Sequence, residues 1–75
     1  MRYRGYTYFE DIQEDDDVRK IFHEIIDPEG RMVNWQLVPD AFHQISPYQS
    51  ATREQFESAV DEVIFRRFTF EYCGS

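Results

Sequence analysis

The strongest structural signal in this sequence lies near its C-terminal end. Thr52 and Gln55 have the spacing of a capping box, in which each side chain can bond the backbone N–H of the other residue. Apolar residues then recur at the spacing of one helix face, namely Phe56, Ala59, Val60, Val63 and Ile64. This pattern predicts a helix over residues 53–66.

The N-terminal part of the chain predicts a strand. Residues 3–12 are rich in tyrosine, phenylalanine and threonine, which favour strands, and Gly5 inside the run indicates a bulge or a close backbone approach. Residues 14–17, Glu-Asp-Asp-Asp, follow as a polar turn. At the other end of the chain, the alternation in residues 68–72 predicts a short strand, with an extension of the preceding helix as the alternative. Gly74 and Ser75 would form a tail.

The segment 18–38 fits two structures. Its apolar residues at positions 18, 21, 22, 25 and 26 have helical spacing. Asp27-Pro28-Glu29-Gly30, however, is typical of a three-residue hairpin loop, and isoleucines and valines flank it. We therefore predict a hairpin of 18–27 with 31–38, in which Asp27 pairs with Arg31, Ile25 with Val33, His23 with Trp35 and Ile21 with Leu37.

The two faces of this hairpin would differ. One face would join the core through Ile21, Ile25, Val33, Trp35 and Leu37, with His23 packed beside the indole of Trp35. The other would be a partly apolar surface, with Phe22, Ile26 and Met32 among Lys20, Glu24, Asn34 and Gln36. After it, residues 40–45 predict one helical turn, ended by Ser46-Pro47.

These elements predict a single domain over residues 1–75 of the α+β class, a small antiparallel sheet of two to four strands packed on one C-terminal α-helix. Seven Phe, five Tyr and one Trp can fill a small core efficiently. The chain shows neither the apolar run of a signal peptide nor a stretch of about 18 apolar residues. We therefore expect a cytoplasmic protein with no membrane partner.

Three sequence features occur in an order that is also found in a known family. They are the segment Arg-Tyr-Arg-Gly-Tyr-Thr at residues 2–7, the Pro-Glu-Gly turn at 28–30, and a C-terminal helix that begins with Ser-Ala-Thr-Arg-Glu at 50–54. In this order the chain resembles the small strand–strand–helix domain of HicB-type antitoxins. The separate DNA-binding segment that many such antitoxins carry is absent from residues 1–75. The resemblance is one of architecture, which does not by itself imply function.

The net charge of −7 argues against direct binding to nucleic acid, which depends on clustered lysine and arginine. Most of the imbalance lies in one acidic run over residues 10–17. The run could be a solvated turn, could dock on a basic patch of another protein, or could bind a cation. Its spacing lacks the ligand pattern of a calcium-binding EF-hand loop.

The residue types needed for catalysis or metal binding are sparse. His23, His43 and Cys73 are too few and too widely spaced for a structural zinc site, and Cys73 is a poor nucleophile so near the chain end. No glycine-rich phosphate loop is present among the three glycines. Tyrosines 3, 6 and 8 with Arg2 and Arg4 could stack bases, but the adjacent acidic run would repel a nucleic acid. We expect no enzyme activity, no metal and no cofactor.

The function expected from this reasoning is a non-catalytic protein-binding module, such as a stoichiometric inhibitor, adaptor or assembly factor, whose partner is another protein with a basic patch. The predicted contact residues are Tyr6, Tyr8, Glu10, Asp11, Glu14, Asp15, Asp16, Asp17, Phe22 and Met32. One alternative is a nucleic-acid mimic that combines residues 10–17 with Glu54, Glu57, Asp61 and Glu62. Another is a self-associating, antitoxin-like structural protein, a homodimer that seals Phe22, Ile26, Met32 and the 68–72 strand.

Overall fold

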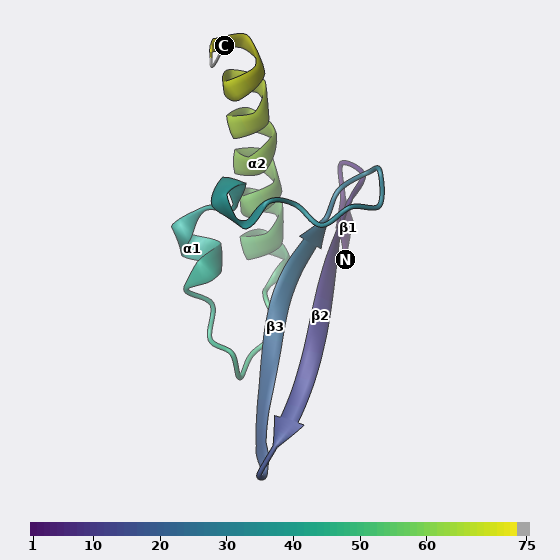
Figure 1. Ribbon diagram of the computed structural model, residues 1–75, viewed down its shortest axis with the longest axis vertical. Helices are drawn as coiled ribbons and strands as arrows, with labels where there is room; N and C mark the ends of the chain where they lie inside the picture. Colours follow the sequence, from purple (N-terminus) through teal and green to yellow (C-terminus); the bar gives the residue numbers. More distant parts are fainter. Residues whose placement is uncertain (74–75) are drawn as a thin grey trace.

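The computed structural model describes residues 1–73, with side chains as far as Thr69, so the predicted tail at Gly74 and Ser75 lies outside the described residues. Three antiparallel strands form a sheet in the order β1-β2-β3, and a long C-terminal helix packs against this sheet (Figure 1). This confirms the predicted small α+β fold. The elements are β1 (Arg2–Tyr3), β2 (Tyr6–Asp15), β3 (Val18–Ile26), the 3-10 helix η1 (Trp35–Leu37), α1 (Asp40–His43) and α2 (Arg53–Cys73).

Two tight turns connect the three strands. Arg4 and Gly5 join β1 to β2 with φ of 52° and 85°, and Asp16 and Asp17 join β2 to β3 with φ of 49° and 66°. Two-residue hairpin loops with positive φ at both positions match the natural twist of the flanking strands. The predicted strand 3–12 is therefore divided by a turn at Gly5, and the predicted turn 14–17 is confined to Asp16 and Asp17.

The strand predicted over 18–27 is present as β3, but its main partner differs from the prediction. β3 pairs with β2 along its whole length, for example Ile21 with Ile12 and Ile25 with Tyr8. Residues 31–38 pair with it at a single bridge, Ile26 to Met32. The predicted pairing with 31–38 is therefore wrong beyond this bridge, and β2 rather than 31–38 is the main partner of β3.

The register predicted around the 27–31 turn is correct where pairing occurs. Asp27 N–H donates to the carbonyl of Arg31 at 2.8 Å, and Val33 N–H donates to the carbonyl of Ile25 at 2.8 Å. The chain then leaves the sheet, because Asn34 accepts the Gln36 N–H at 3.0 Å and starts η1. The predicted pairs of residue 23 with 35 and of 21 with 37 do not form.

This departure changes the surroundings of the two predicted neighbours, His23 and Trp35. The His23 ring packs against Tyr8 and Phe42, with ring centres 5.9 and 6.2 Å away, rather than beside the indole. Trp35 is 48% exposed and stacks on His43 at 4.2 Å. His43 is the last residue of α1 (Asp40–His43), and this helix confirms the helical turn predicted within 40–45.

Helix α2 starts where the sequence predicts. Thr52 N–H donates to Gln55 Oε1 at 2.8 Å and Gln55 N–H donates to Thr52 Oγ1 at 3.1 Å, which completes the capping box. The helix continues to Cys73, so the predicted 68–72 strand is wrong and the alternative of a longer helix is correct. Residues 53–73 contain no glycine or proline to end the helix. Arg66 also anchors this region by donating to the carbonyls of Leu37 and Val38 at 3.3 and 3.5 Å.

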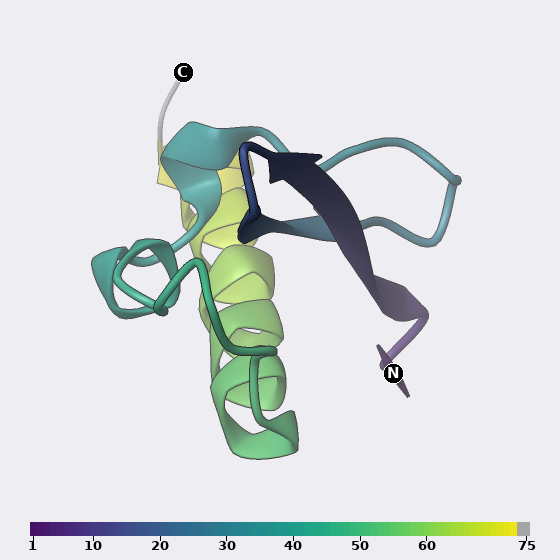
Figure 2. The same ribbon diagram turned by 90° about the horizontal axis from the view of Figure 1, so that it is seen from below.

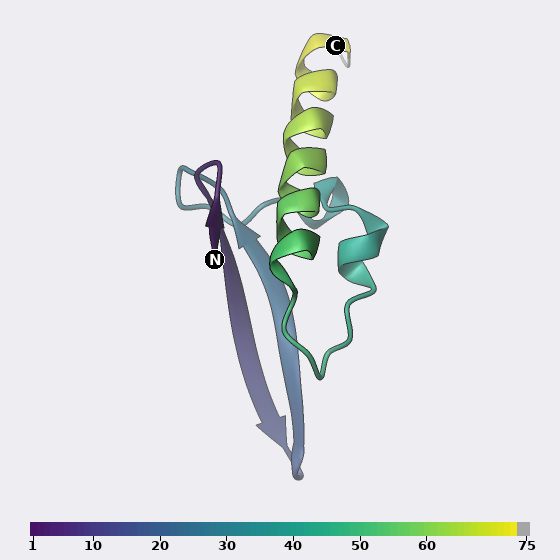
Figure 3. The same ribbon diagram turned by 180° about the vertical axis from the view of Figure 1, so that it is seen from behind.

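The core lies between α2 and one face of the sheet. Phe56, Val60 and Val63 of α2 are fully buried, opposite Tyr6 and Ile25 of the sheet. The segment between β3 and α2 adds four further buried apolar side chains, Val33, Val38, Phe42 and Ala51. Figures 2 and 3 show that α2 lies on one side of the β2–β3 hairpin.

The molecule is elongated. Its extents are 47 × 21 × 20 Å and its radius of gyration is 13.4 Å, compared with about 11 Å for a compact domain of this length. The tip of the β2–β3 hairpin extends past one end of the core, and the C-terminal part of α2 extends past the other (Figure 1). Among the described residues, the hairpin tip and the helix around Phe65 are therefore exposed to solvent.

Candidate protein-binding surface

The sheet face turned away from α2 carries several exposed apolar side chains. Successive side chains of a strand alternate between its two faces, so Tyr6 and Tyr8 turn into the core while Phe9 turns outward. We call the outward side the back face, made up of Thr7, Phe9, Asp11, Gln13, Asp15, Val18, Lys20, Phe22, Glu24, Ile26 and the adjoining Met32. Phe9 is 50%, Phe22 46% and Met32 60% exposed.

Rings and carboxylates alternate across the back face. Phe9 lies opposite Glu24 on the neighbouring strand, and Asp11 lies opposite Phe22. Each phenyl ring therefore has a carboxylate directly across the sheet and the other ring diagonally across it, within reach of a large side chain. This arrangement suits a partner surface that combines apolar side chains with lysine or arginine.

The structure distributes the six acids predicted as contacts over three places. Asp16 and Asp17 form the tip of the hairpin, while Asp11 and Asp15 point to the back face. Glu10 and Glu14 point to the other face, where Glu14 lies 4.0 Å from Arg19. The acidic tip, Asp15–Asp17, is fully open to solvent and adjoins the back face.

Two predicted contact residues, Tyr6 and Tyr8, are not exposed. Tyr6 is 5% exposed within the core, and Tyr8 is partly buried, with its ring centre 5.9 Å from that of Phe56 and 6.3 Å from that of Phe42. The sequence interpretation of both tyrosines as exposed aromatics is therefore wrong. The outward ring of this strand is Phe9, which the sequence interpretation omitted although the alternation of residues 6–9 places it on the face opposite both tyrosines.

The hydroxyl of Tyr8 joins the sheet to the loop before α2. It accepts the backbone N–H of Ala51 at 3.1 Å and lies within hydrogen-bonding distance of Glu10 (2.9 Å) and of Nδ1 of His23. The other ring nitrogen of His23 faces the carbonyl of Ser46 at 3.1 Å. That carbonyl can only accept, so Nε2 donates this bond, while the single proton of the Tyr8 hydroxyl is donated to Glu10.

The electrostatics of this network follow from its burial and its hydrogen bonds. Burial raises the pKa of Tyr8 to about 12. Hydrogen bonds from Ser50 and Tyr8 hold the pKa of Glu10 below its usual value. Because every member of the network bonds to a neighbour within the protein, we assign it to the support of the 46–51 loop.

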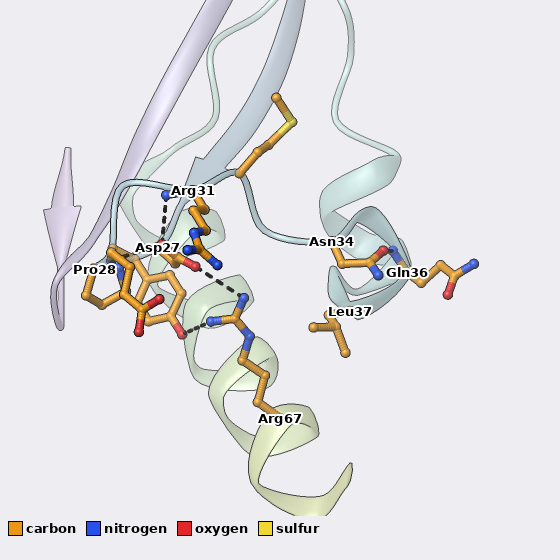
Figure 4. Close-up of a pocket in the computed structure, with 10 residues that line it drawn as sticks. Asp27, Pro28, Arg31, Asn34, Gln36, Leu37 and Arg67 are labelled. Carbon is orange, nitrogen blue, oxygen red and sulfur yellow. Dashed lines mark hydrogen bonds and ion pairs between the residues drawn. The ribbon is translucent and has the colours of Figure 1, made fainter. Parts of the chain in front are cut away.

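A second polar junction fastens the 27–31 turn to α2 (Figure 4). Arg67 donates to the Tyr6 hydroxyl at 3.1 Å, lies 3.5 Å from Asp27 Oδ2 and covers the Tyr6 ring at 5.9 Å from its centre. These groups line an open cavity of about 670 Å³, to which Arg31, Asn34 and Gln36 also contribute. The Arg67 guanidinium already has partners within the chain, so this site acts as a structural clasp.

Asp27 is the centre of this clasp. Its Oδ1 accepts the backbone N–H of Arg31 at 2.9 Å and of Glu29 at 3.0 Å. The hydrogen bonds from Arg31 and Glu29, together with the charge of Arg67, hold the pKa of Asp27 below its usual value. Asp27 stabilises the turn as a carboxylate, in the manner of an Asx-turn.

Other site types find no support in the described part of the chain. Among its residues, no group of three or more His, Cys, Asp or Glu side chains could hold a metal ion. Within the same residues, no helix has the length and apolar character needed to cross a bilayer. The side chain of Cys73 lies outside the described residues. No family model matches the chain, and neither the curated proteins nor the solved structures include a match to it.

Proposed function

We propose that this protein is a non-catalytic protein-binding module that contacts its partner through the back face and the acidic tip. The observation that carries the proposal is the exposure of Phe9, Phe22 and Met32 on a sheet face that α2 leaves uncovered. Aromatic and methionine side chains are enriched at protein interfaces. Contiguous exposed apolar surface with a polar rim is typical of an interaction site.

The charge of the surface supports a partner with a basic patch. Asp11 and Glu24 lie between the rings of the back face, and Asp15, Asp16 and Asp17 continue the negative charge to the hairpin tip. Complementary charge speeds association and fixes the orientation of the two proteins, while buried rings supply most of the affinity. The partner would therefore insert apolar side chains between basic ones.

The two alternative functions have less support in the geometry. A nucleic-acid mimic needs free carboxylates, but on α2 Glu57 lies 2.6 Å from Arg53, Asp61 lies 3.1 Å from Arg4, and Glu62 lies 3.3 Å from Arg66. A dimer sealed by a 68–72 strand lacks that strand, because α2 runs through this region. A dimer through the back face alone remains a competing result of the experiment below.

Affinity capture with variants tests the proposal. The full chain would be used as bait in a lysate of its own cell, with Phe22→Ser as the test and Phe65→Ser as the matched control, because Phe65 is 68% exposed on α2. We expect Phe22→Ser to weaken capture of a specific protein by about thirtyfold, as for an interface hot spot. Phe65→Ser should leave it unchanged.

The outcomes separate the candidate surfaces. Equal capture by wild type and Phe22→Ser would contradict the proposal, and loss of capture with Phe65→Ser alone would move the interface to α2. Light scattering on the purified chain would detect a dimer. If Phe22→Ser dissolved that dimer and no other protein were captured, self-association would replace the proposed function.

A further inference from the structure

β3 forms one edge of the sheet, since the strand order is β1-β2-β3. In an antiparallel strand every second residue directs its backbone N–H and C=O away from the neighbouring strand. Two bonds identify these residues on β3: Ile21 N–H donates to the Pro47 carbonyl at 2.7 Å, and Ile25 C=O accepts from Val33 N–H at 2.8 Å. His23, midway between them, also directs its backbone outward.

The edge is open between these two bonds. Among the described residues, no hydrogen bond is made by the C=O of Ile21, by the N–H and C=O of His23 or by the N–H of Ile25 on this side. Pro47 has no N–H with which to reach back to Ile21. His23 is only 9% exposed, and backbone groups in such surroundings usually find partners.

An apolar cavity adjoins this open edge. The chain from Asn34 to Pro47 leaves the end of β3 and returns to its middle, and it encloses about 680 Å³ against the strand. The lining is predominantly apolar and includes Phe22, Met32, Trp35, Phe42, Ile45 and Pro47. Phe22 and Met32 also belong to the back face, so the cavity is continuous with the proposed binding surface.

We propose that this cavity binds an extended segment of the partner protein, which adds to the edge of β3 at His23. The inference rests on the proposed function and identifies how the partner is recognised. Added strands gain affinity from main-chain hydrogen bonds and specificity from pockets for alternate side chains. The open edge from Ile21 to Ile25 is about 13 Å long, which accommodates three or four extended residues.

The side-chain directions of β3 specify the sequence of this segment. The residue opposite His23 directs its side chain to the inner face of the sheet, toward the apolar wall of the cavity. Its two neighbours point to the back face, beside Phe22 and Glu24, with Asp11 directly across from Phe22. The segment is therefore apolar in the middle and has lysine or arginine on each side.

A peptide titration followed by NMR tests this inference. The probe is acetyl-Lys-Val-Lys-amide, whose three residues fit the open edge, added to the full chain labelled with nitrogen-15. We expect saturable shifts at His23 and Ile25, with slower hydrogen exchange of both amides. Methylation of the central valine nitrogen should weaken binding at least about tenfold, because it removes the donor to the His23 carbonyl.

A charge reversal gives the matched control. Glu24→Lys should weaken peptide binding about fivefold, whereas Glu54→Lys, an exposed change at the start of α2, should have no effect. Binding that is insensitive to N-methylation would overturn the proposal. So would protection of the His23 and Ile25 amides that rises with concentration in the free protein, since a second copy would then cover the edge.

Failure here is distinguishable from failure of the proposed function. If the peptide leaves His23 and Ile25 unchanged while Phe22→Ser abolishes partner capture, the edge proposal alone is wrong. If peptide binding follows the expected pattern but capture does not depend on Phe22, the cavity is a peptide site and the back face is not the interface. If the peptide does not bind at His23 and Ile25 and partner capture does not depend on Phe22, both proposals are wrong.

Discussion

Single residues with unusual backbone geometry fix both ends of the sheet, and Gly5 is the most constrained of them. Its φ of +85° is strained for any residue with a Cβ, and a Cβ added there would lie 2.9 Å from Pro28 Cγ. The β1–β2 turn therefore packs directly on the 27–31 turn. Gly30 has a similar φ of +83°, but a Cβ added there would contact no atom within 4 Å.

This pair of glycines permits a matched comparison. We expect Gly30→Ala to lower the free energy of unfolding by about 1–2 kcal/mol through backbone strain alone. Gly5→Ala should cost at least about 1 kcal/mol more, because Pro28 must also move. Chemical denaturation of the two variants measures the difference, and equal losses would show that the contact with Pro28 is unimportant.

Tyr8 is the second residue whose role can be tested singly. Tyr8→Phe would leave the Ala51 N–H and His23 Nδ1 without their partner, so we expect the free energy of unfolding to fall by about 1–3 kcal/mol. Tyr48→Phe, at a side chain that is 63% exposed, is the control and should change little. A neutral result for Tyr8→Phe would mean that the loop is held by packing alone.

The raised pKa of Tyr8 gives the same residue a signature at high pH. A pKa of about 12 in the folded protein, against about 10 for an unperturbed tyrosine, means that folding favours the neutral phenol. The contribution of the neutral Tyr8 phenol to the stability of the fold is fully present below pH 10 and is lost as the pH rises from about 10 to about 12. Tyr8→Phe should flatten this part of the stability profile, and an unchanged profile would contradict the assignment.

At the scale of elements, the β2–β3 hairpin is the feature that the sequence interpretation missed. Its turn, Asp16-Asp17, lacks the Asn-Gly or Asp-Gly pair that is the strongest local signal for a hairpin. Two aspartates with φ of 49° and 66° are tolerated there because nine residues of β2 pair with nine of β3. Long-range pairing rather than the turn sequence determines this element.

A better turn sequence should therefore stabilise the protein. We expect the double variant Asp16→Asn with Asp17→Gly to raise the free energy of unfolding by about 0.5–1 kcal/mol, since both replacements favour positive φ. The control is the pair Asp11→Asn with Asp15→Asn, which removes the same charge from positions with ordinary φ. An equal gain in both double variants would attribute the effect to charge.

The sequence predicted correctly those parts of the fold that depend on interactions between residues close together in the chain. The start of α2 is fixed by the Thr52–Gln55 capping box, and the register near the 27–31 turn is fixed by Asp27. The full path after Val33 could not be predicted, because it depends on Phe42 packing against Tyr8 and His23, which are distant in the sequence. The acids of residues 10–17, interpreted from the sequence as one turn, lie on both faces of the hairpin and at its tip, and the outward direction of Phe9 needed the face of β2 to be known.

At the scale of the whole molecule, Asp27 connects the sheet, the 27–31 turn and α2, so acid should loosen all three together. Its lowered pKa means that the carboxylate stabilises the folded state above the unfolded pKa of about 4, and that this stabilisation is lost as the pH falls through the folded value. Asp27→Asn should reduce the acid dependence of unfolding, measured by thermal melts from pH 7 to pH 2.5. The control Asp11→Asn, at a side chain with no hydrogen bond or ion pair among the described residues, should leave that dependence as in wild type.

The elongated molecule has two separate exposed surfaces: the back face with the adjoining acidic tip, and the end of α2 around Phe65 and Phe68. Among the side chains that the structure describes, only those of the back face place exposed rings opposite acids of a neighbouring strand. A partner that binds there would cover Phe9, Phe22 and Met32 together. It would leave Phe65 in solvent.

Site-specific photocrosslinking measures this contact most directly. A photoreactive phenylalanine analogue would replace Phe22 in one variant and Phe65 in another, each expressed in the protein's own cell and irradiated. We predict one discrete crosslinked partner from position 22, weakened when Asp15, Asp16 and Asp17 are reversed to lysine, and no crosslink to it from position 65. A crosslink to that partner from position 65 alone would contradict the assignment of the back face as the binding surface.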